Sequence, residues 1–164
     1  MMNNILVALD GSDRADRVFR YAVDLARSLG ASLRLLRVVA VPPEFPPAGH
    51  VPHADDLPAY LVAQAEGQLR AFAAQAPHLH VETMVVDSTQ PWRAIIDVAD
   101  QIDADLIVVG SHGYHGLDYL LGTNASKVAN LARRNVLVVH RAPNQAPAEG
   151  YRHAPGPRGA PKRP

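Results

Sequence analysis

Apolar residues along the chain follow two alternating patterns, short runs and longer stretches with helical spacing. The runs have the length and composition of strands and cover residues 5–9, 31–40, 79–86, 104–110 and 135–139. Between them, apolar residues recur every three or four positions, as in an amphipathic helix, within residues 18–29, 61–76, 88–103 and 122–133. The chain therefore alternates strand and helix up to residue 139.

Turn and cap residues mark the ends of several expected elements. Gly30 follows the first helical stretch, where a left-handed residue ends a helix at low cost. Ser88 or Thr89 can cap the third stretch, and Pro91 fits its first turn. Strands that alternate with helices form parallel sheets with right-handed crossovers. The pattern predicts an α/β fold: a single doubly wound five-stranded parallel sheet with helices on both faces.

Two segments fall outside the alternating pattern. Residues 41–58 hold six prolines, which lack the N–H that helix interiors and central strands use, so we expect a loop. Residues 141–164 are rich in Pro, Ala, Gly and Arg and hold almost nothing to bury. Such a composition predicts a disordered tail. The folded domain should then span residues 1–140.

Composition argues against several classes of function. Lys and Arg together number 16, as do Asp and Glu, and a net charge of zero argues against nucleic-acid or membrane-surface binding. There is no cysteine, which removes disulfides and thiolate chemistry. No apolar run has the length of a membrane span or the form of a signal sequence. We therefore expect a cytoplasmic protein that binds neither nucleic acid nor membrane.

The stretch "IVVGSHGYHGLDYLLGTNASKV", residues 107–128, joins a strand pattern to a helical one. Ser111 does not fit a nucleophile elbow, because Val109 stands where G-x-S-x-G needs its first glycine. His112 and His115 fall short of the three or four ligands that zinc requires, which makes a metal site a weak hypothesis. A Walker loop is absent because no lysine has the required place.

A phosphate cradle without a Walker lysine is the fourth hypothesis for this stretch. Gly110 and Gly113 follow the carboxyl end of an expected strand, where glycine lets backbone N–H groups approach an anion. Gly122, Thr123 and Asn124 open the next helix, whose free N–H groups and dipole favour negative charge. Ligands of open α/β sheets bind at this carboxyl edge, which favours the hypothesis.

The first expected strand ends in another polar turn, Asp10-Gly11-Ser12. In a doubly wound sheet this turn lies at the same edge as Gly110, and a carboxylate there is suited to bind ribose hydroxyls. A second interpretation is that Asp10 or Ser12 caps the first helix. Both interpretations stay open from the sequence pattern alone.

Several stretches together resemble the universal stress protein family over residues 3–140. They are "ILVALDGSD", "ADLIVVGSHG" and "LLGTNASKVANLARRNVLVVH", in the strand and helix order given above. ATP-binding members of that family carry G-x2-G-x9-G-[ST]. Here the motif corresponds to Gly110, Gly113, Gly122 and Thr123, with a spacer of eight residues, 114–121, in place of nine. Some members with a "GTNA" helix start use this shorter spacer and still bind nucleotides.

The resemblance implies roles for nine residues. Asp10 would hold the ribose hydroxyls, while Ala8 and Val38 would line the adenine pocket. Val109 and Gly110 would lie against the ribose and adenine. The phosphates would be held by backbone N–H groups and side-chain oxygens of Gly113, Gly122, Thr123 and Asn124.

The resemblance also implies a ligand, a strand order and a partner. The ligand would be ATP, with ADP or AMP as alternatives and Mg²⁺ only as carried by the nucleotide. The sheet would be flavodoxin-like, with strand order 3-2-1-4-5. Homodimers would pair the last strand, which also protects an apolar sheet edge; its residues are Val136, Leu137, Val138 and Val139.

Phosphoryl transfer needs cations and metal ligands placed around the reacting phosphate, and the glycine motif supplies no evident general base, arginine finger or carboxylate pair. We therefore expect an ATP-binding stress-response or regulatory module with slow hydrolysis at most. One alternative is a nucleotide-free dimer that acts through protein contacts; another is an enzyme of the related adenine-nucleotide α-hydrolase group. Phe72 and Trp92 are expected in the core, from their helical spacing.

Overall fold

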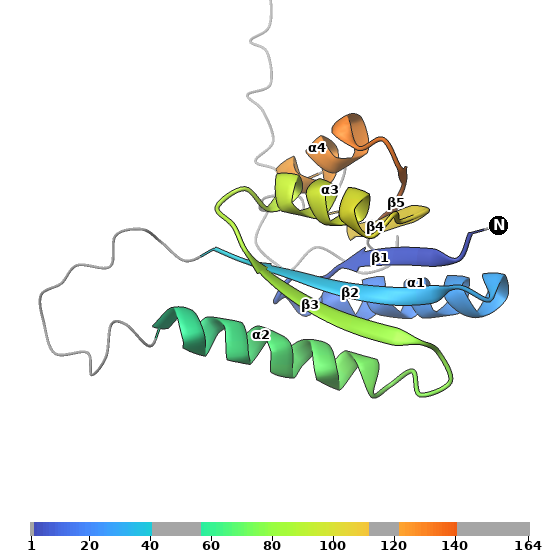
Figure 1. The fold of residues 1–164 in the computed structure, drawn as a ribbon, viewed down its shortest axis with the longest axis horizontal. Coiled ribbons are helices and arrows are strands. Elements are labelled where there is room, and N and C mark those ends of the chain that lie inside the picture. Colours follow the sequence, from blue (N-terminus) through green and yellow to red (C-terminus); the bar gives the residue numbers. More distant parts are fainter. Residues whose placement is uncertain (1, 41–56, 112–121, 141–164) are drawn as a thin grey trace, which may run out of the picture.

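A computed structural model of the chain describes residues 2–40, 57–111 and 122–140 (Figure 1). Strands and helices alternate throughout these residues. The elements are β1 (Asn4–Ala8), α1 (Ala15–Leu29), β2 (Ser32–Val39), α2 (Leu57–Ala73), β3 (Val81–Asp87), α3 (Pro91–Gln101), β4 (Leu106–Gly110), α4 (Thr123–Leu131) and β5 (Asn135–Val139).

The strands form one parallel sheet in the order β3-β2-β1-β4-β5. In Figure 1, α1 and α2 lie on one face of the sheet, and α3 and α4 lie on the other. The predicted α/β fold, with five parallel strands in the order 3-2-1-4-5 and helices on both faces, is confirmed.

Each face of the sheet buries its own apolar cluster. Ile5 and Val7 of β1 join the cluster under α1 and α2, whereas Leu6 joins the cluster under α3 and α4. This alternation follows from the two-residue period of a strand. Among the described residues no polar or charged residue is buried as a whole.

The strand register places the carboxyl ends of several strands at one edge of the sheet. Ala8 pairs with Leu36 of β2 and with Val109 of β4. Gly110 at the end of β4 pairs with Val139 at the end of β5. The carboxyl ends of β1, β2, β4 and β5 thus finish close together, which is the edge where open α/β sheets bind ligands.

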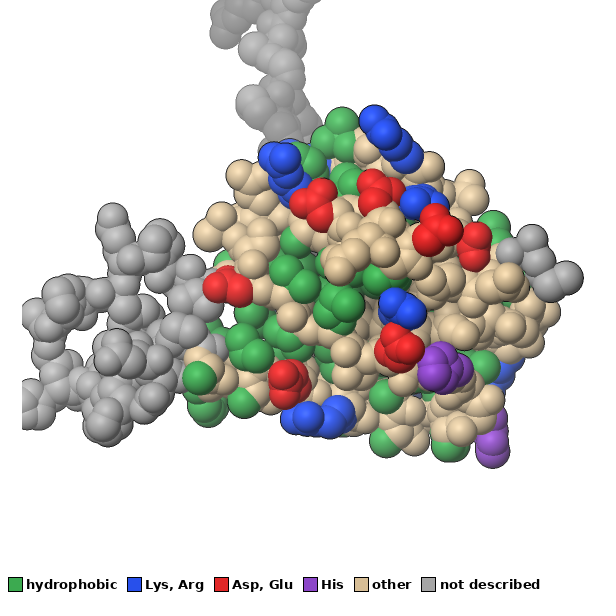
Figure 2. All heavy atoms as spheres, in the orientation of Figure 1, with side chains coloured by type: hydrophobic (Ala, Val, Ile, Leu, Met, Phe, Trp, Pro, Cys, Tyr) green, Lys and Arg blue, Asp and Glu red, His purple; other side chains and the backbone are tan. Residues whose placement is uncertain are grey.

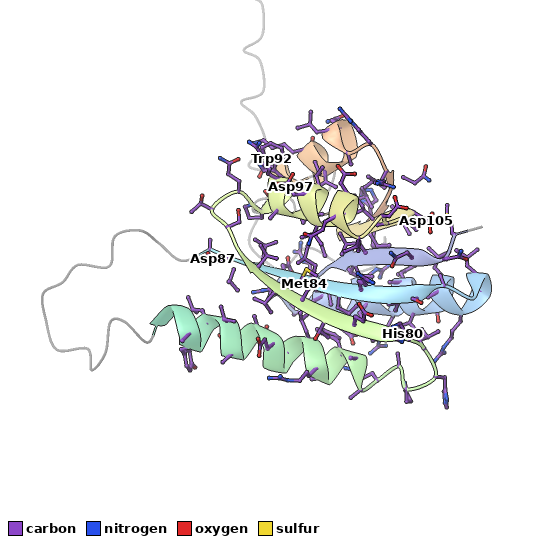
Figure 3. All side chains as sticks on the ribbon, viewed as in Figure 1. His80, Met84, Asp87, Trp92, Asp97 and Asp105 are labelled. Atoms are coloured by element: carbon purple, nitrogen blue, oxygen red, sulfur yellow. The ribbon has the colours of Figure 1, made fainter. Side chains whose placement is uncertain are left out.

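Ionic contacts stabilise the opposite edge of the sheet. Asp105, labelled in Figure 3, accepts hydrogen bonds from the backbone N–H groups of Asn3 (2.8 Å) and Asn4 (3.0 Å). These bonds lower the pKa of the Asp105 carboxyl. Arg134 contacts Asp103 at 2.7 Å and Asp100 at 3.0 Å, and both carboxylates raise the pKa of the guanidinium. The start of β1 is therefore tied to the start of β4.

Two of the expected helix boundaries are confirmed and one is wrong. Gly30 has a left-handed φ of 67° directly after α1, and Pro91 is the first residue of α3. The cap of α3 is wrong, because Gln90 holds the N-cap position and makes no side-chain cap bond. Ser88 instead accepts a hydrogen bond from the N–H of Gln90 at 3.1 Å. Its hydroxyl closes a turn before the helix, so it is not available as a cap.

Three other boundaries differ from the prediction. α2 begins at Leu57, so the loop expected at 41–58 was predicted too long at its end. Pro58 lies in the first turn of α2, where a helix tolerates proline. The same helix ends at Ala73, before Ala76, whose side chain is still buried. α4 ends at Leu131 because the backbone of the next residue, Ala132, is extended. The side chain of Leu131 is 56% exposed. The predicted tail, 141–164, lies outside the described residues.

The two aromatic residues expected in the core are partly buried and pack against the two core clusters. Phe72 of α2 meets Phe19 of α1, with ring centroids 5.1 Å apart. Trp92 of α3 packs against the cluster under α3 and α4, and the Nζ of Lys127 lies 5.1 Å from its ring. The first contact joins α1 to α2, and the second joins α3 to α4.

Candidate functional site

A cleft of about 890 Å³ opens at the carboxyl edge of the sheet. Its walls come from the ends of β1, β2, β4 and β5, from α1 as far as Asp24, and from the first turns of α3 and α4. Its volume is in the range of clefts that hold small organic ligands. β1 lies between β2 and β4, so the chain order reverses there, and such switch points are where open α/β sheets bind ligands.

Six of the nine predicted site residues line this one cleft. They are Ala8, Asp10, Val38, Val109, Gly110 and Asn124. Gly122 and Thr123 directly precede Asn124 at the start of α4, where Gly122 is buried and Thr123 is exposed. Gly113 lies outside the described residues. Segments far apart in sequence therefore meet at the cleft.

The cleft has an apolar part formed by neighbouring strands. Ala8, Val38 and Val109 all belong to the cluster on the side of α3 and α4. Pro91 and Ile95 of α3 add apolar surface to the same wall. An apolar wall with few polar groups is suited to a flat ring system, because burial of such a ring removes apolar surface from water.

A polar turn borders the apolar part of the cleft. The Oδ1 atom of Asp10 accepts hydrogen bonds from the Oγ (2.6 Å) and the backbone N–H (3.2 Å) of Ser12. Ser12 Oγ in turn accepts the N–H of Arg14 at 3.3 Å. Arg14 is the N-cap residue of α1 and no side chain caps the helix there. Neither Asp10 nor Ser12 occupies the N-cap position of α1, but Ser12 accepts an N–H of the turn that leads into the helix.

Arg37 of β2 is a cleft residue that the sequence did not suggest as functional. Its Nε and Nη1 atoms are buried and have no hydrogen-bond partner in the part of the chain that the structure describes. Burial lowers the pKa of its guanidinium, and the nearby charge of Asp10 acts in the opposite direction. A charged residue that interrupts an apolar strand beside Val38 was the available signal.

Two glycines at the cleft have packing reasons for their identity. A Cβ added to Gly11 would collide with the guanidinium of Arg37. A Cβ added to Gly110 would lie 3.1 Å from the Cγ2 of Val18, which is tighter than ordinary side-chain contacts. Close packing of β4 on α1 therefore favours glycine at 110 independently of any anion.

The start of α4 presents backbone groups at the other end of the cleft. Gly122 is the N-cap residue with φ −55° and ψ 151°, and no side chain caps the helix. Its carbonyl accepts the N–H of Ser126 at 2.8 Å. Asn124, in the first turn, lines the cleft. An uncapped helix start with its positive dipole end favours a negative group nearby.

A second, shallower groove of about 550 Å³ lies between β3 and α3 and contains none of the predicted site residues. Figure 2 shows hydrophobic side chains gathered over β2 and β3 beside it. Met84, Asp87 and Asp97, labelled in Figure 3, are among its lining residues. The Nε of Arg93 lies 4.0 Å from the Asp97 carboxylate.

Two further searches cover the described residues only. No group of three or more His, Asp or Glu side chains in them is arranged to hold a metal ion. No helix among them has both the length and the apolar character to cross a membrane.

Comparison with known proteins gives one consistent result. The sequence profile of the universal stress protein family matches residues 1–140. Universal stress protein A homolog 1 of Coxiella burnetii is 30% identical over 143 residues, which cover 83% of this chain and 94% of that protein.

Solved structures agree with the sequence comparison. The universal stress protein UspA from Lactobacillus plantarum is 31% identical with a TM-score of 0.66, over 85% of this chain and 98% of that one. A universal stress protein crystallised in complex with cAMP is 28% identical with a TM-score of 0.65, at the same two coverages. The sequence profile, the relatives and the shared fold together show that this chain belongs to the universal stress protein family.

Proposed function

We propose that this universal stress protein binds an adenine nucleotide, with ATP as its ligand in the cell, in the cleft at the carboxyl edge of the sheet. Binding would make the protein a nucleotide-dependent stress-response or regulatory module. The observation that carries the proposal is the convergence of six predicted site residues, from four separate chain segments, on one cleft.

The two parts of the cleft match the two parts of such a ligand. The apolar wall formed by Ala8, Val38 and Val109 would receive the adenine ring. Asp10, which is exposed at the cleft, would accept hydrogen bonds from the ribose hydroxyls. The uncapped start of α4 would face the phosphates, because helix N-termini bind anions. The relative crystallised with cAMP supports an adenine nucleotide as the class of ligand.

We expect ATP hydrolysis to be slow at most. Transfer of a phosphoryl group depends on cationic side chains and metal ions that stabilise the charge on the reacting phosphate. Among the described residues at the start of α4, Asn124 lines the cleft, and Gly122 and Thr123 directly precede it; these three offer backbone N–H groups and neutral side chains. Mg²⁺ would arrive with the nucleotide. Binding, and the conformation or partner surface that it favours, would carry the function.

Thermal unfolding with ATP, ADP, AMP and GTP tests the proposal. A ligand that binds only the folded protein stabilises it by about 2.7 kcal/mol at a hundredfold excess over Kd, so adenine nucleotides should raise the Tm. Asp10→Asn removes the charge that would hold the ribose and should reduce the rise. The matched control is Asp97→Asn, in the second groove, which should leave the rise intact. No rise with any adenine nucleotide would contradict the proposal.

A second candidate function is a nucleotide-free homodimer that acts through protein contacts. One observation favours an interface at β5. This edge strand leaves Leu137 37% exposed, and Leu131 at the end of α4 is also exposed. Edge strands with exposed apolar side chains tend to pair with a second chain. Val139 at the end of β5 also lines the cleft, whereas Leu137 does not, so variants at Leu137 and at Asp10 would separate dimerisation from nucleotide binding.

A further inference from the structure

Arg37 carries charged donors that the described protein does not satisfy. Its Nε and Nη1 atoms are both buried, and neither has a hydrogen-bond partner among the described residues. A buried donor without an acceptor destabilises the folded state, and a charged donor does so more strongly. Burial also lowers the pKa of the Arg37 guanidinium. Arg37 lines the cleft, so a small shift of its guanidinium would let these donors meet an acceptor that enters there.

The position of Arg37 points to one end of the proposed ligand. Its Nη2 atom lies against the backbone of Gly11, so that an added Cβ at this glycine would collide with it. Gly11 directly follows Asp10, the residue that would hold the ribose, and the charge of Asp10 acts on Arg37. Arg37 therefore lies beside the ribose end of the cleft. The uncapped start of α4 belongs to a different segment of the cleft wall.

A second guanidinium lines the same cleft. Arg17 of α1 lines the cleft, and its Nε is also buried without a partner among the described residues. Its guanidinium carbon lies 5.4 Å from the centre of the Tyr21 ring, which holds one side of the group. Two cationic side chains with unsatisfied donors in one cleft favour an anionic ligand group there.

We propose that Arg37 binds a phosphate group on the ribose, so that the cleft prefers adenine nucleotides with a 2′- or 3′-phosphate to those phosphorylated at the 5′ position alone. Arginine is well suited to phosphate oxygens, with which it forms strong charge-assisted hydrogen bonds. In dinucleotide-binding folds either an acidic residue binds the free ribose 2′-hydroxyl, or a nearby arginine accommodates a phosphate at that position. This cleft has both, so Asp10 would bind the free hydroxyl and Arg37 the phosphorylated one. The inference rests on the proposed function, since Asp10 locates the ribose.

Calorimetric titration of the full chain tests this preference. The probes are adenosine 3′,5′-bisphosphate, adenosine 2′,5′-bisphosphate, ADP and AMP. ADP has two phosphates, as the bisphosphates do, so a comparison at equal phosphate number isolates the position of the second phosphate. We expect one of the bisphosphates to bind about tenfold or more tightly than ADP, as a charge-assisted hydrogen bond would give. Equal affinity of ADP and both bisphosphates would overturn the proposal, whatever the variants do.

Substitution of Arg37 identifies the residue responsible. Arg37→Gln should weaken binding of the preferred bisphosphate by about 10- to 100-fold, and by at least tenfold more than it weakens binding of AMP. Arg37→Lys, which keeps the charge, should retain part of the preference. The matched control is Arg34→Gln on the same strand, whose guanidinium pairs with Glu82 at 3.1 Å outside the cleft. It should leave the preference unchanged.

The outcomes separate this inference from the proposed function. If Arg37→Gln weakens AMP, ADP and the bisphosphates equally, Arg37 positions the turn of Asp10 and does not bind a ribose phosphate. If AMP and ADP bind and the bisphosphates gain nothing, the inference alone is wrong. If no adenine nucleotide binds, the proposed function fails and the inference fails with it. Circular dichroism of each variant establishes that it is folded before titration.

Discussion

Phe19 of α1 and Phe72 of α2 meet with ring centroids 5.1 Å apart and ring planes tilted by 46°. Aromatic pairs favour such tilted contacts over flat stacking, and the contact adds to what area burial alone gives. Phe19 is only 2% exposed, whereas Phe72 packs against the cluster from its rim. The pair joins the two helices that cover one face of the sheet.

The first prediction concerns this pair. Phe19→Ala should lower the free energy of unfolding by about 3–5 kcal/mol, as is typical when a buried phenylalanine is truncated. Phe72→Ala should cost less because its ring is only half-buried. Tyr60→Ala, on α2 but 62% exposed, should change stability by about 0.5 kcal/mol or less. Urea unfolding measures all three. Equal midpoints for the Phe19 and Tyr60 variants would contradict the packing described.

Two glycines should respond to alanine with opposite signs. Gly30 has a φ of 67°, and nothing lies within 4 Å of an added Cβ, so Gly30→Ala should cost about 1–2 kcal/mol from backbone strain alone. Gly67 lies inside α2 at an exposed site with open space around it. Gly67→Ala should therefore raise stability by about 0.5–1 kcal/mol. Thermal unfolding of both variants gives the comparison, and changes of the same sign would refute it.

Asp105 should make stability depend on pH in the acid range. The N–H groups of Asn3 and Asn4 lower its pKa in the folded protein below the value of about 3.9 typical of an unfolded chain. Its contribution is therefore complete above about pH 5 and is lost as pH falls from there toward the lower folded pKa. Asp105→Asn should be less stable than the natural protein at pH 7, and the difference should shrink in acid.

The measurement for Asp105 is the Tm as a function of pH for both proteins. Asp97→Asn serves as the control, because its carboxylate is exposed and lies 4.0 Å from Arg93 in a surface ion pair. Such pairs contribute little to stability. A difference between the Asp105 variant and the natural protein that is constant down to pH 2 would show that ionisation of Asp105 does not stabilise the fold.

The exposed edge of β5 gives a test of the dimer. Leu137→Lys places a charge on an edge that would otherwise present an apolar side chain, and lysine at edges discourages strand pairing. If the homodimer pairs through this strand, the variant should be monomeric at protein concentrations where the natural chain is dimeric. Sedimentation velocity over a range of concentrations reports the mass. Arg70→Glu on α2, far from β5 in sequence and structure, is the control (Figure 1).

Apolar patterning predicted the elements well because each strand and helix buries one or two faces. The run of β4 is fully apolar, and four of its five residues are buried at the centre of the sheet. The run of β5 reads the same in sequence, yet Leu137 is exposed because β5 lies at the edge. Strand order depends on contacts across the sheet, which local patterns do not contain. The order was expected only from the family resemblance.

Helix ends and Arg37 show what local sequence leaves out. Ser88 has the chemistry of a cap, but the path of the chain gives it the N–H of Gln90 outside the helix. The turn at Asp10 and the strand end at Gly110 were expected at one edge, and both line the cleft. The sequence did not point to Arg37, because its contact with Gly11 depends on how β2 packs beside the turn that follows β1.

The central position of β1 has a consequence for synthesis of the chain. Ile5 pairs with Leu33 on one side and with Leu106 on the other, about a hundred residues later. As the chain emerges, β1, β2 and β3 can associate while the second edge of β1 is still open. Unpaired strand edges and apolar surface in partly made chains promote aggregation. The nascent protein is therefore exposed to aggregation until β4 closes that edge, so pauses in translation before β4 has left the ribosome would be more harmful than later pauses.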